Sequence, residues 1–99
     1  MNDYSWPDGG QRLAARSREA WRATVEKLPV GTAIAGEVVG RQPFGIFIRI
    51  DGVPDAVGLA EITAMPREAT LPPMGSRIVG TVTSHTEHNH QVRVRLGHW

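Results

Sequence analysis

The sequence lacks cysteine altogether, and this absence excludes several kinds of chemistry. Without cysteine the protein has no disulfide, no thiolate nucleophile and no thiolate metal site. A long apolar run is missing too, since no stretch approaches the roughly 18 residues that span a membrane. Residues 1–8 have neither a basic flank nor an apolar run, so no signal peptide is predicted. These absences fit a soluble, cytoplasmic protein with no membrane partner.

An excess of charge of either sign is also missing. The formal net charge is +1, and residues 31–99 carry six basic and six acidic residues. Residues 1–30 are nearly balanced, with five basic and four acidic residues. Strong nonspecific binders of nucleic acid usually carry a marked positive excess. If this protein binds nucleic acid, we therefore expect weak or assisted binding.

The sequence contains none of the motifs that would indicate an enzyme. There is no Gly-x-Ser-x-Gly nucleophile elbow, no phosphate-binding loop and no acid–base pair with a credible cleft. We therefore predict a non-enzymatic protein that needs no cofactor.

What is present begins with a polar N-terminal segment. Residues 1–10 end in Gly9-Gly10, which predicts a flexible leader. Trp6 is the only large side chain in this leader that is a candidate for packing on the domain.

Residues 11–28 have the spacing of an amphipathic helix, which Pro29 and Gly31 end. Its apolar side consists of Leu13, Ser17, Trp21, Val25 and Leu28. A broad apolar stripe normally faces a core, so we predict that the helix packs Trp21 against the rest of the domain. The alternative is a helix that binds a protein partner. Its arginines either remain solvated or contact phosphate.

After Gly31 the apolar pattern changes to a period of two, which is typical of β-strands. Strands are predicted at residues 34–39, 44–50, 56–62, 77–83 and 91–96. Five strands with no long helix between them indicate an all-β fold, and five is the strand count of the oligonucleotide-binding (OB) barrel. We therefore predict a five-stranded OB barrel over residues 29–97, preceded by one N-terminal α-helix.

Several glycine-anchored segments follow one another in this region. They are Val30–Val38, Pro43–Ile48, Val57–Thr63 and Met74–Val82, with Val92–Leu96 as a closing strand. In order and spacing they resemble the S-one RNA-binding domain of ribosomal proteins. Phe44-Gly45-Ile46-Phe47 is similar to the aromatic-glycine-x-phenylalanine signature of that family. The resemblance covers about residues 28–96, and it implies an S-one-like OB fold that binds single-stranded RNA.

The resemblance implies that Phe44 and Phe47 stack on bases. Such stacking is worth roughly 1–3 kcal/mol per base and needs no particular sequence. Phe47 and Arg49 share the strand face opposite the isoleucines, so Phe47 should not be needed for the core. Arg93 and Arg95, on the outer face of the last strand, are further candidates for contacts with phosphates or bases.

Other observations favour different interpretations of the same face. Trp6 or Trp21 could cover the two phenylalanines, because exposed aromatic surface is usually in contact with another segment or a partner. Glu61 stands where the family has a histidine, and its carboxylate repels phosphate but can accept hydrogen bonds from base amino groups. Thr86 and Gln91 replace a family aspartate and a family basic residue. A second hypothesis is therefore a protein-interaction module that reuses the OB fold without binding nucleic acid.

A histidine-rich segment separates the last two predicted strands. It contains His85, His88 and His90. With Glu87 they could bind zinc, but several ligands on one loop are poorly preorganised, so no metal site is predicted. In OB folds this loop lines the oligonucleotide groove. We therefore include the three histidines among the candidate nucleic-acid-binding residues, where they stack on bases and gain charge near pH 6.5 or below.

Overall fold

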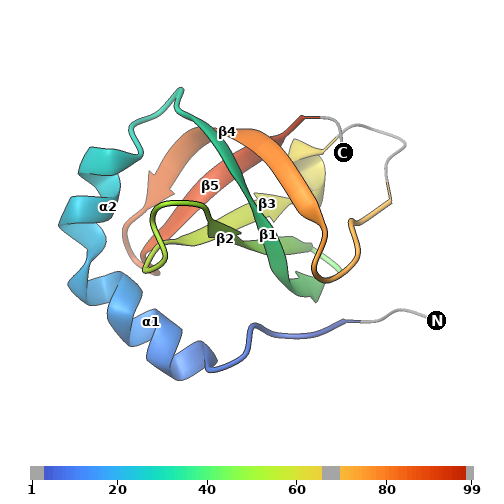
Figure 1. Cartoon of the computed structure of the whole chain (residues 1–99), viewed down its shortest axis with the longest axis horizontal. Helices are drawn as coiled ribbons and strands as arrows, with labels where there is room; N and C mark the ends of the chain where they lie inside the picture. The colour runs from blue at the N-terminus through green and yellow to red at the C-terminus, as the bar shows by residue number, and fades with distance from the viewer. Residues whose placement is uncertain (1–3, 66–69, 98–99) are drawn as a thin grey trace.

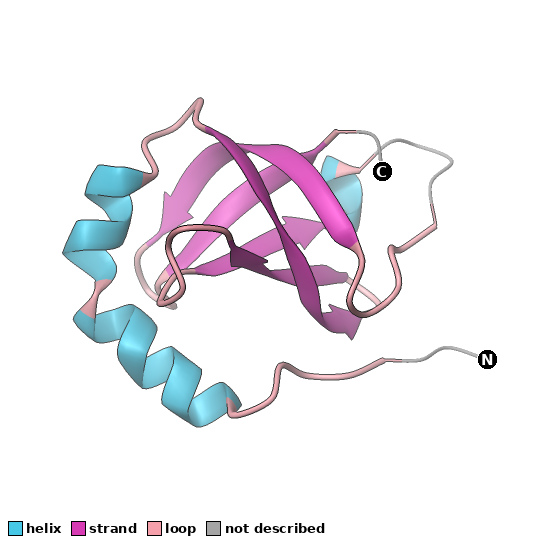
Figure 2. Cartoon of the chain, in the orientation of Figure 1, coloured by secondary structure: helices cyan, strands magenta, loops and turns pink. Residues whose placement is uncertain are grey.

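A computed structural model describes residues 4–65 and 70–97 of the chain. Five strands form a closed barrel in the order β1-β2-β3-β5-β4 (Figure 1, Figure 2). The strands are β1 Ala33–Gln42, β2 Gly45–Ile50, β3 Val57–Glu61, β4 Arg77–Thr86 and β5 Gln91–Leu96. A short 3₁₀ helix, η1 (Ile62–Ala64), follows β3. The predicted five-stranded OB barrel is confirmed.

β1 closes the barrel because it pairs with a different strand along each half. Residues Ala33–Glu37 pair with β4, and residues Gly36–Gln42 pair with β2. The change of partner requires a sharp bend, and a bulge between Val38 and Gly40 contributes to it. Glycine is required at Gly36 because a Cβ atom there would lie 2.5 Å from the carbonyl oxygen of Arg49.

An aliphatic core fills the barrel. Its large members are Ile34, Val38, Ile46, Ile48, Ile50, Ile78, Val82, Val92, Val94 and Leu96. They stand at alternate positions of β1, β2, β4 and β5, as the period-two pattern predicted. Burying one such side chain contributes about 1.5–3 kcal/mol. The outward side chains between them are not needed to fill this core.

Two short helices stand where the sequence predicted one over residues 11–28. They are α1 (Gly10–Glu19) and α2 (Trp21–Lys27). The helix predicted here is divided at Ala20, and each half follows a different part of the curved barrel (Figure 1). Leu13 packs beside Phe47, whereas Trp21 packs against the main core as predicted. Within the described ranges, neither helix is long and apolar enough to cross a membrane.

The chain before α1 lies against the barrel. We call residues 4–9 the N-terminal arm, which runs past the end of β1 (Figure 1). The N–H of Ser5 donates to the carbonyl oxygen of Arg41 at 2.7 Å, and the N–H of Arg41 donates back to Ser5 at 2.6 Å. The edge of β1 is open for this pairing because β4 leaves β1 at Glu37. The described part of the predicted flexible leader is therefore a docked segment, and residues 1–3 lie outside the described residues.

Candidate nucleic-acid interface

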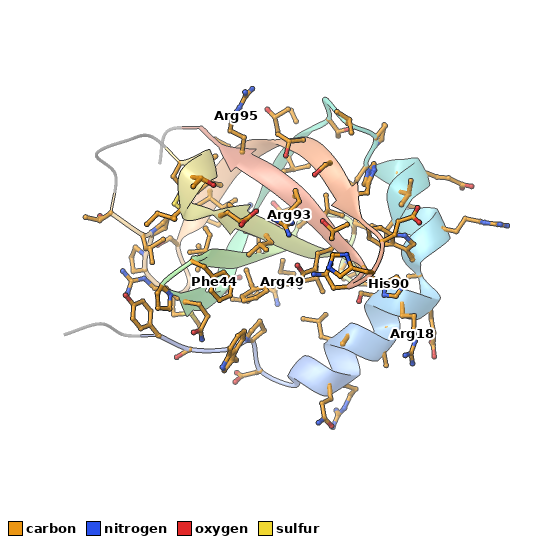
Figure 3. The ribbon with its side chains drawn as sticks, turned by 180° about the vertical axis from the view of Figure 1, so that it is seen from behind. Arg18, Phe44, Arg49, His90, Arg93 and Arg95 are labelled. Atoms are coloured by element: carbon orange, nitrogen blue, oxygen red, sulfur yellow. The ribbon has the colours of Figure 1, made fainter. Side chains whose placement is uncertain are left out.

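The outer face of β2, β3 and β5 carries four residues of the predicted site, Phe47, Arg49, Glu61 and Arg93. Phe47 of β2 is in register with Leu59 of β3, and Leu59 is in register with Arg93 of β5. Arg49 lies in the adjacent row, opposite Val57. Figure 3 views the molecule from this side, with Arg49 and Arg93 near its centre. The strand pairing thus brings together predicted residues that are distant in the sequence.

Phe47 points outward from β2, as predicted, but another part of the chain covers it. The ring centroid of Trp6 lies 5.8 Å from that of Phe47, and Leu13 of α1 packs against the small cluster that Phe47 forms with Val57 and Leu59. Phe47 is therefore only 7% exposed. The expectation that Phe47 is not needed for packing was wrong, because an outward position ensures exposure only where no other segment lies over the sheet.

Trp6, Phe44 and Phe47 form an aromatic cluster on this face. The Trp6 and Phe44 centroids are 6.2 Å apart, and Phe44 meets Phe47 edge-on at 6.0 Å. Trp6 is 63% exposed and Phe44 is 42% exposed. Trp6 therefore covers Phe47, but the alternative that it covers both phenylalanines does not hold for Phe44. The accessible aromatic surface of the cluster therefore belongs to Trp6 and Phe44.

Contacts on both sides of Trp6 hold the arm in place. Ser5 pairs with Arg41 through backbone hydrogen bonds, and the guanidinium of Arg41 lies 5.8 Å from the ring centroid of Tyr4. On the other side, Pro7 packs on Gly40, where a Cβ atom would lie 2.7 Å from the Pro7 Cδ. The position of Trp6 is thus set by backbone pairing before it and by close packing after it.

The two arginines of the face are each paired with a carboxylate. Arg49 Nη2 donates to Glu37 Oε1 at 2.7 Å. Arg93 forms an ion pair with Glu61 and also donates from Nε to Thr86 Oγ1 at 3.1 Å. The predicted candidate Glu61 therefore neutralises Arg93. These pairs orient the guanidinium groups and weaken the positive field of the face.

Arg95 does not join these residues. It is in register with Thr81 of β4 and lies beside Ala33 and Val79. Figure 3 shows it at the edge of the barrel, away from Arg93, and it shows Arg18 projecting from α1. Arg95 can meet only a ligand that extends well beyond the aromatic cluster.

The structure gives His85 and His90 a shared contact with Trp21 and leaves His88 apart from them. His85 belongs to β4, and its Nε2 lies 2.6 Å from the carbonyl oxygen of Leu28, so Nε2 is the donor. The rings of His85 and His90 meet Trp21 edge-on, with centroids 6.1 Å and 5.5 Å away. Both rings are half-buried contacts of α2, whereas His88 is exposed. Among the described residues, no three acidic or histidine side chains are grouped to hold a metal ion.

A further ion pair lies outside the predicted site. Arg77 at the start of β4 donates from Nη1 to Asp51 Oδ1 at 3.1 Å. The hydrogen bond from Arg77 lowers the pKa of Asp51 below its usual value, and the same bond raises the pKa of Arg77. Both side chains are more than half exposed, so solvent screening leaves the pair little weight in stability.

A pocket of about 370 Å³ opens beside the aromatic cluster, between the arm, α1 and the barrel. We call it the arm pocket; it is lined by apolar side chains and amides, among them Trp6, Leu13, Phe47, Gln11, Asn89 and Gln91. It was not predicted from the sequence, because its walls come from segments far apart in the chain. The one feature of the sequence that could have indicated it is Trp6, a large apolar residue in an otherwise polar leader.

The fold and this face together define a small OB barrel that resembles S-one domains, and the N-terminal arm partly covers its aromatic face. Comparison with known proteins agrees. Small ribosomal subunit protein bS1 of Rhodopseudomonas palustris is 42% identical over 45 residues, which is 46% of this chain and 8% of that protein. This chain therefore corresponds to a small part of that relative's length. No protein-family model matches the chain.

Solved structures share the fold over most of the chain. RNase R of Mycoplasma genitalium, in complex with ribose-methylated single-stranded RNA, matches with a TM-score of 0.70 and 16% identity. The match covers 89% of this chain and 15% of RNase R. GSP13 of Bacillus subtilis matches with a TM-score of 0.59 and 20% identity, over 70% of this chain and 55% of GSP13. The resemblance to the S-one-like OB fold is confirmed.

Proposed function

We propose that this chain is a non-enzymatic module that binds single-stranded RNA through the outer face of β2, β3 and β5. The observation that carries the proposal is the accessible pair Trp6 and Phe44 beside the oriented Arg49 and Arg93. Aromatic rings stack on any base, and arginines contact the phosphates between bases. A face that combines both groups suits an unpaired strand.

The comparisons support this proposal. The matched relative is a protein of the small ribosomal subunit, and the matched RNase R structure contains single-stranded RNA. We infer that this chain acts in the cytoplasm as an accessory to a larger RNA-containing assembly. Within such an assembly a weak individual contact is sufficient, because linked sites raise the effective concentration of the strand.

The paired arginines indicate that binding is weak. Arg49 is paired with Glu37, and Arg93 is paired with Glu61. When either arginine contacts a phosphate, its carboxylate partner must move away or lie close to the RNA. The carboxylates then repel the phosphate that approaches. Most of the affinity for RNA therefore comes from base stacking, and little comes from charge.

The same neutral charge favours the second candidate function, a protein-interaction module. Ion pairs with balanced charge and an exposed aromatic pair are also found at protein interfaces, where tyrosine, tryptophan and arginine are enriched. The exposed face of α1 and α2 would then contribute to the contact with the partner.

One titration separates the two candidates. Short single-stranded RNA is added to the protein at low salt while backbone amide shifts are followed by NMR. We expect saturable shifts around Phe44 and Arg93, and Phe44→Ala should weaken binding by about 5- to 150-fold, the equivalent of one lost stacking contact. Val79→Ala is the matched control, because Val79 is an exposed apolar side chain on β4 outside this face.

The absence of saturable shifts at low salt would overturn the RNA proposal and leave the interaction module. Equal loss of binding in the Phe44 and Val79 variants would also count against it, because a site on β2 predicts a difference between the two.

A further inference from the structure

We propose that the arm pocket holds one nucleobase of the RNA strand, and that Gln11, Asn89 and Gln91 bind the edge of this base. The inference rests on the proposed function and deepens it. It assigns part of the binding site to the N-terminal arm and α1, so the barrel alone would not form the complete site.

The lining of the pocket selects an uncharged, flat group. None of the described residues that line it is charged, so a phosphate would lose its hydration there without gaining a counter-ion. The walls are apolar: Trp6 offers exposed aromatic surface, and Leu13, Val57 and the nearly buried Phe47 complete them. Its volume of about 370 Å³ is near the lower end of the roughly 300–1,000 Å³ range of ligand pockets, which suits a small ligand.

The side-chain amides of the pocket are free for a ligand. In the part of the chain that the structure describes, the side-chain amides of Gln11, Asn89 and Gln91 form no hydrogen bond with another protein group. The Ser17 hydroxyl, by contrast, already donates to the carbonyl oxygen of Ala14 at 2.9 Å. Each amide offers both a donor and an acceptor. Base edges display the same two kinds of group, which is why asparagine and glutamine recognise bases.

The pocket is continuous with the aromatic cluster, because Trp6 and Phe47 belong to both. A strand with one base stacked on the exposed rings can therefore place a neighbouring base in the pocket. Splayed bases that stack on aromatic side chains and hydrogen-bond through their edges are typical of single-stranded RNA recognition. The phosphates remain outside the pocket, where Arg93 can meet them once Glu61 has released it.

The test combines amide variants with RNA that lacks single bases. Affinities of the full chain are measured for a short single-stranded RNA and for a series in which each nucleotide in turn is abasic. Asn89→Ala and Gln91→Ala should each weaken binding of the intact RNA by about fivefold or more. Gln42→Ala is the matched control, because Gln42 is an amide on β1 outside the pocket. At one abasic position, wild type and the two pocket variants should bind equally.

The outcomes separate the inference from the proposed function. RNA binding that depends on Phe44 but is unchanged by Asn89→Ala and Gln91→Ala overturns the pocket assignment and leaves the proposed function standing. The absence of saturable RNA binding by the wild type overturns both. Asn89 is exposed, so its substitution removes no core packing, and an unchanged thermal midpoint shows that lost affinity belongs to the site. If Gln91→Ala unfolds the protein, Asn89→Ala decides the question.

Discussion

The ring of Phe47 extends from the outer face of β2 and yet is almost completely buried, because Trp6 and Leu13 lie over it. Phe44, three residues earlier, stays 42% exposed. The two phenylalanines of the signature therefore have different energetic roles. Phe47 joins the arm and α1 to the barrel, whereas Phe44 offers its ring to a ligand.

Substitution of these two residues should separate stability from binding. We expect Phe47→Ala to lower the free energy of unfolding by about 3–5 kcal/mol, because it removes a buried ring and leaves a cavity. Phe44→Ala should change it by less than about 1 kcal/mol, since water already reaches the ring. Urea unfolding measures both values. Equal losses in the two variants would contradict the difference in burial.

The histidines divide in the same way. His85 hydrogen-bonds to the carbonyl oxygen of Leu28 and contacts Trp21, whereas His88 is exposed. His85→Ala leaves a partly buried carbonyl without its donor and should lower the free energy of unfolding by about 1–3 kcal/mol. His88→Ala should stay within about 0.5 kcal/mol of wild type. Chemical denaturation of both variants tests this, and a stable His85 variant would argue against an anchoring role.

At the scale of elements, the N-terminal arm behaves as a short extra strand on the open edge of β1. Its pairing needs no particular side chain, because Ser5 and Arg41 meet through backbone groups. Its packing does need a particular residue, since Pro7 occupies the space of a side chain at Gly40. The arm in turn places Trp6 over Phe47 and completes the wall of the arm pocket.

Gly40→Ala should therefore loosen the arm. The added methyl group would meet Pro7 at 2.7 Å and Phe47 at 2.9 Å, so the arm has to move away. We expect faster hydrogen exchange of the Ser5 and Arg41 amides, with little change at core amides such as that of Val82. Gly97→Ala is the control, because a Cβ atom there has no neighbour closer than 3.7 Å. Unchanged exchange in the Gly40 variant would show that Pro7 does not hold the arm.

For the molecule as a whole, positive charge is largely compensated. The formal net charge is +1. Among the described residues, ion pairs join Arg16 to Asp55, Arg49 to Glu37, Arg77 to Asp51 and Arg93 to Glu61. Single-stranded RNA that binds such a surface releases few counterions.

Binding of single-stranded RNA should therefore depend weakly on salt. With one or two phosphate contacts, the slope of log K against log salt concentration is expected between about −0.7 and −1.4. Fluorescence titrations between 50 and roughly 300 mM salt would measure this slope. A slope steeper than about −3 would indicate several phosphate contacts, and the uncompensated arginines of α1 or Arg95 would then have to join the site.

The OB barrel could be predicted from the sequence because its signals are local and repeated. Ile46, Ile48 and Ile50 alternate with outward residues, and each predicted strand has the same period. Glycines such as Gly36 mark close approaches of the strands that no side chain permits. The outward direction of Phe47 follows from the same alternation, and the structure confirms it.

Only the tertiary structure shows that the N-terminal arm covers Phe47 on the outer face of β2. Alternation determines the direction of Phe47 but not whether Trp6 lies above it. The helix breaks at Ala20 because α1 and α2 follow a curved surface, and curvature leaves no mark in an amphipathic pattern. The arm docks through backbone hydrogen bonds of Ser5, which almost every residue can form. The arm pocket exists only where these distant segments meet, so its chemistry is a property of the folded chain.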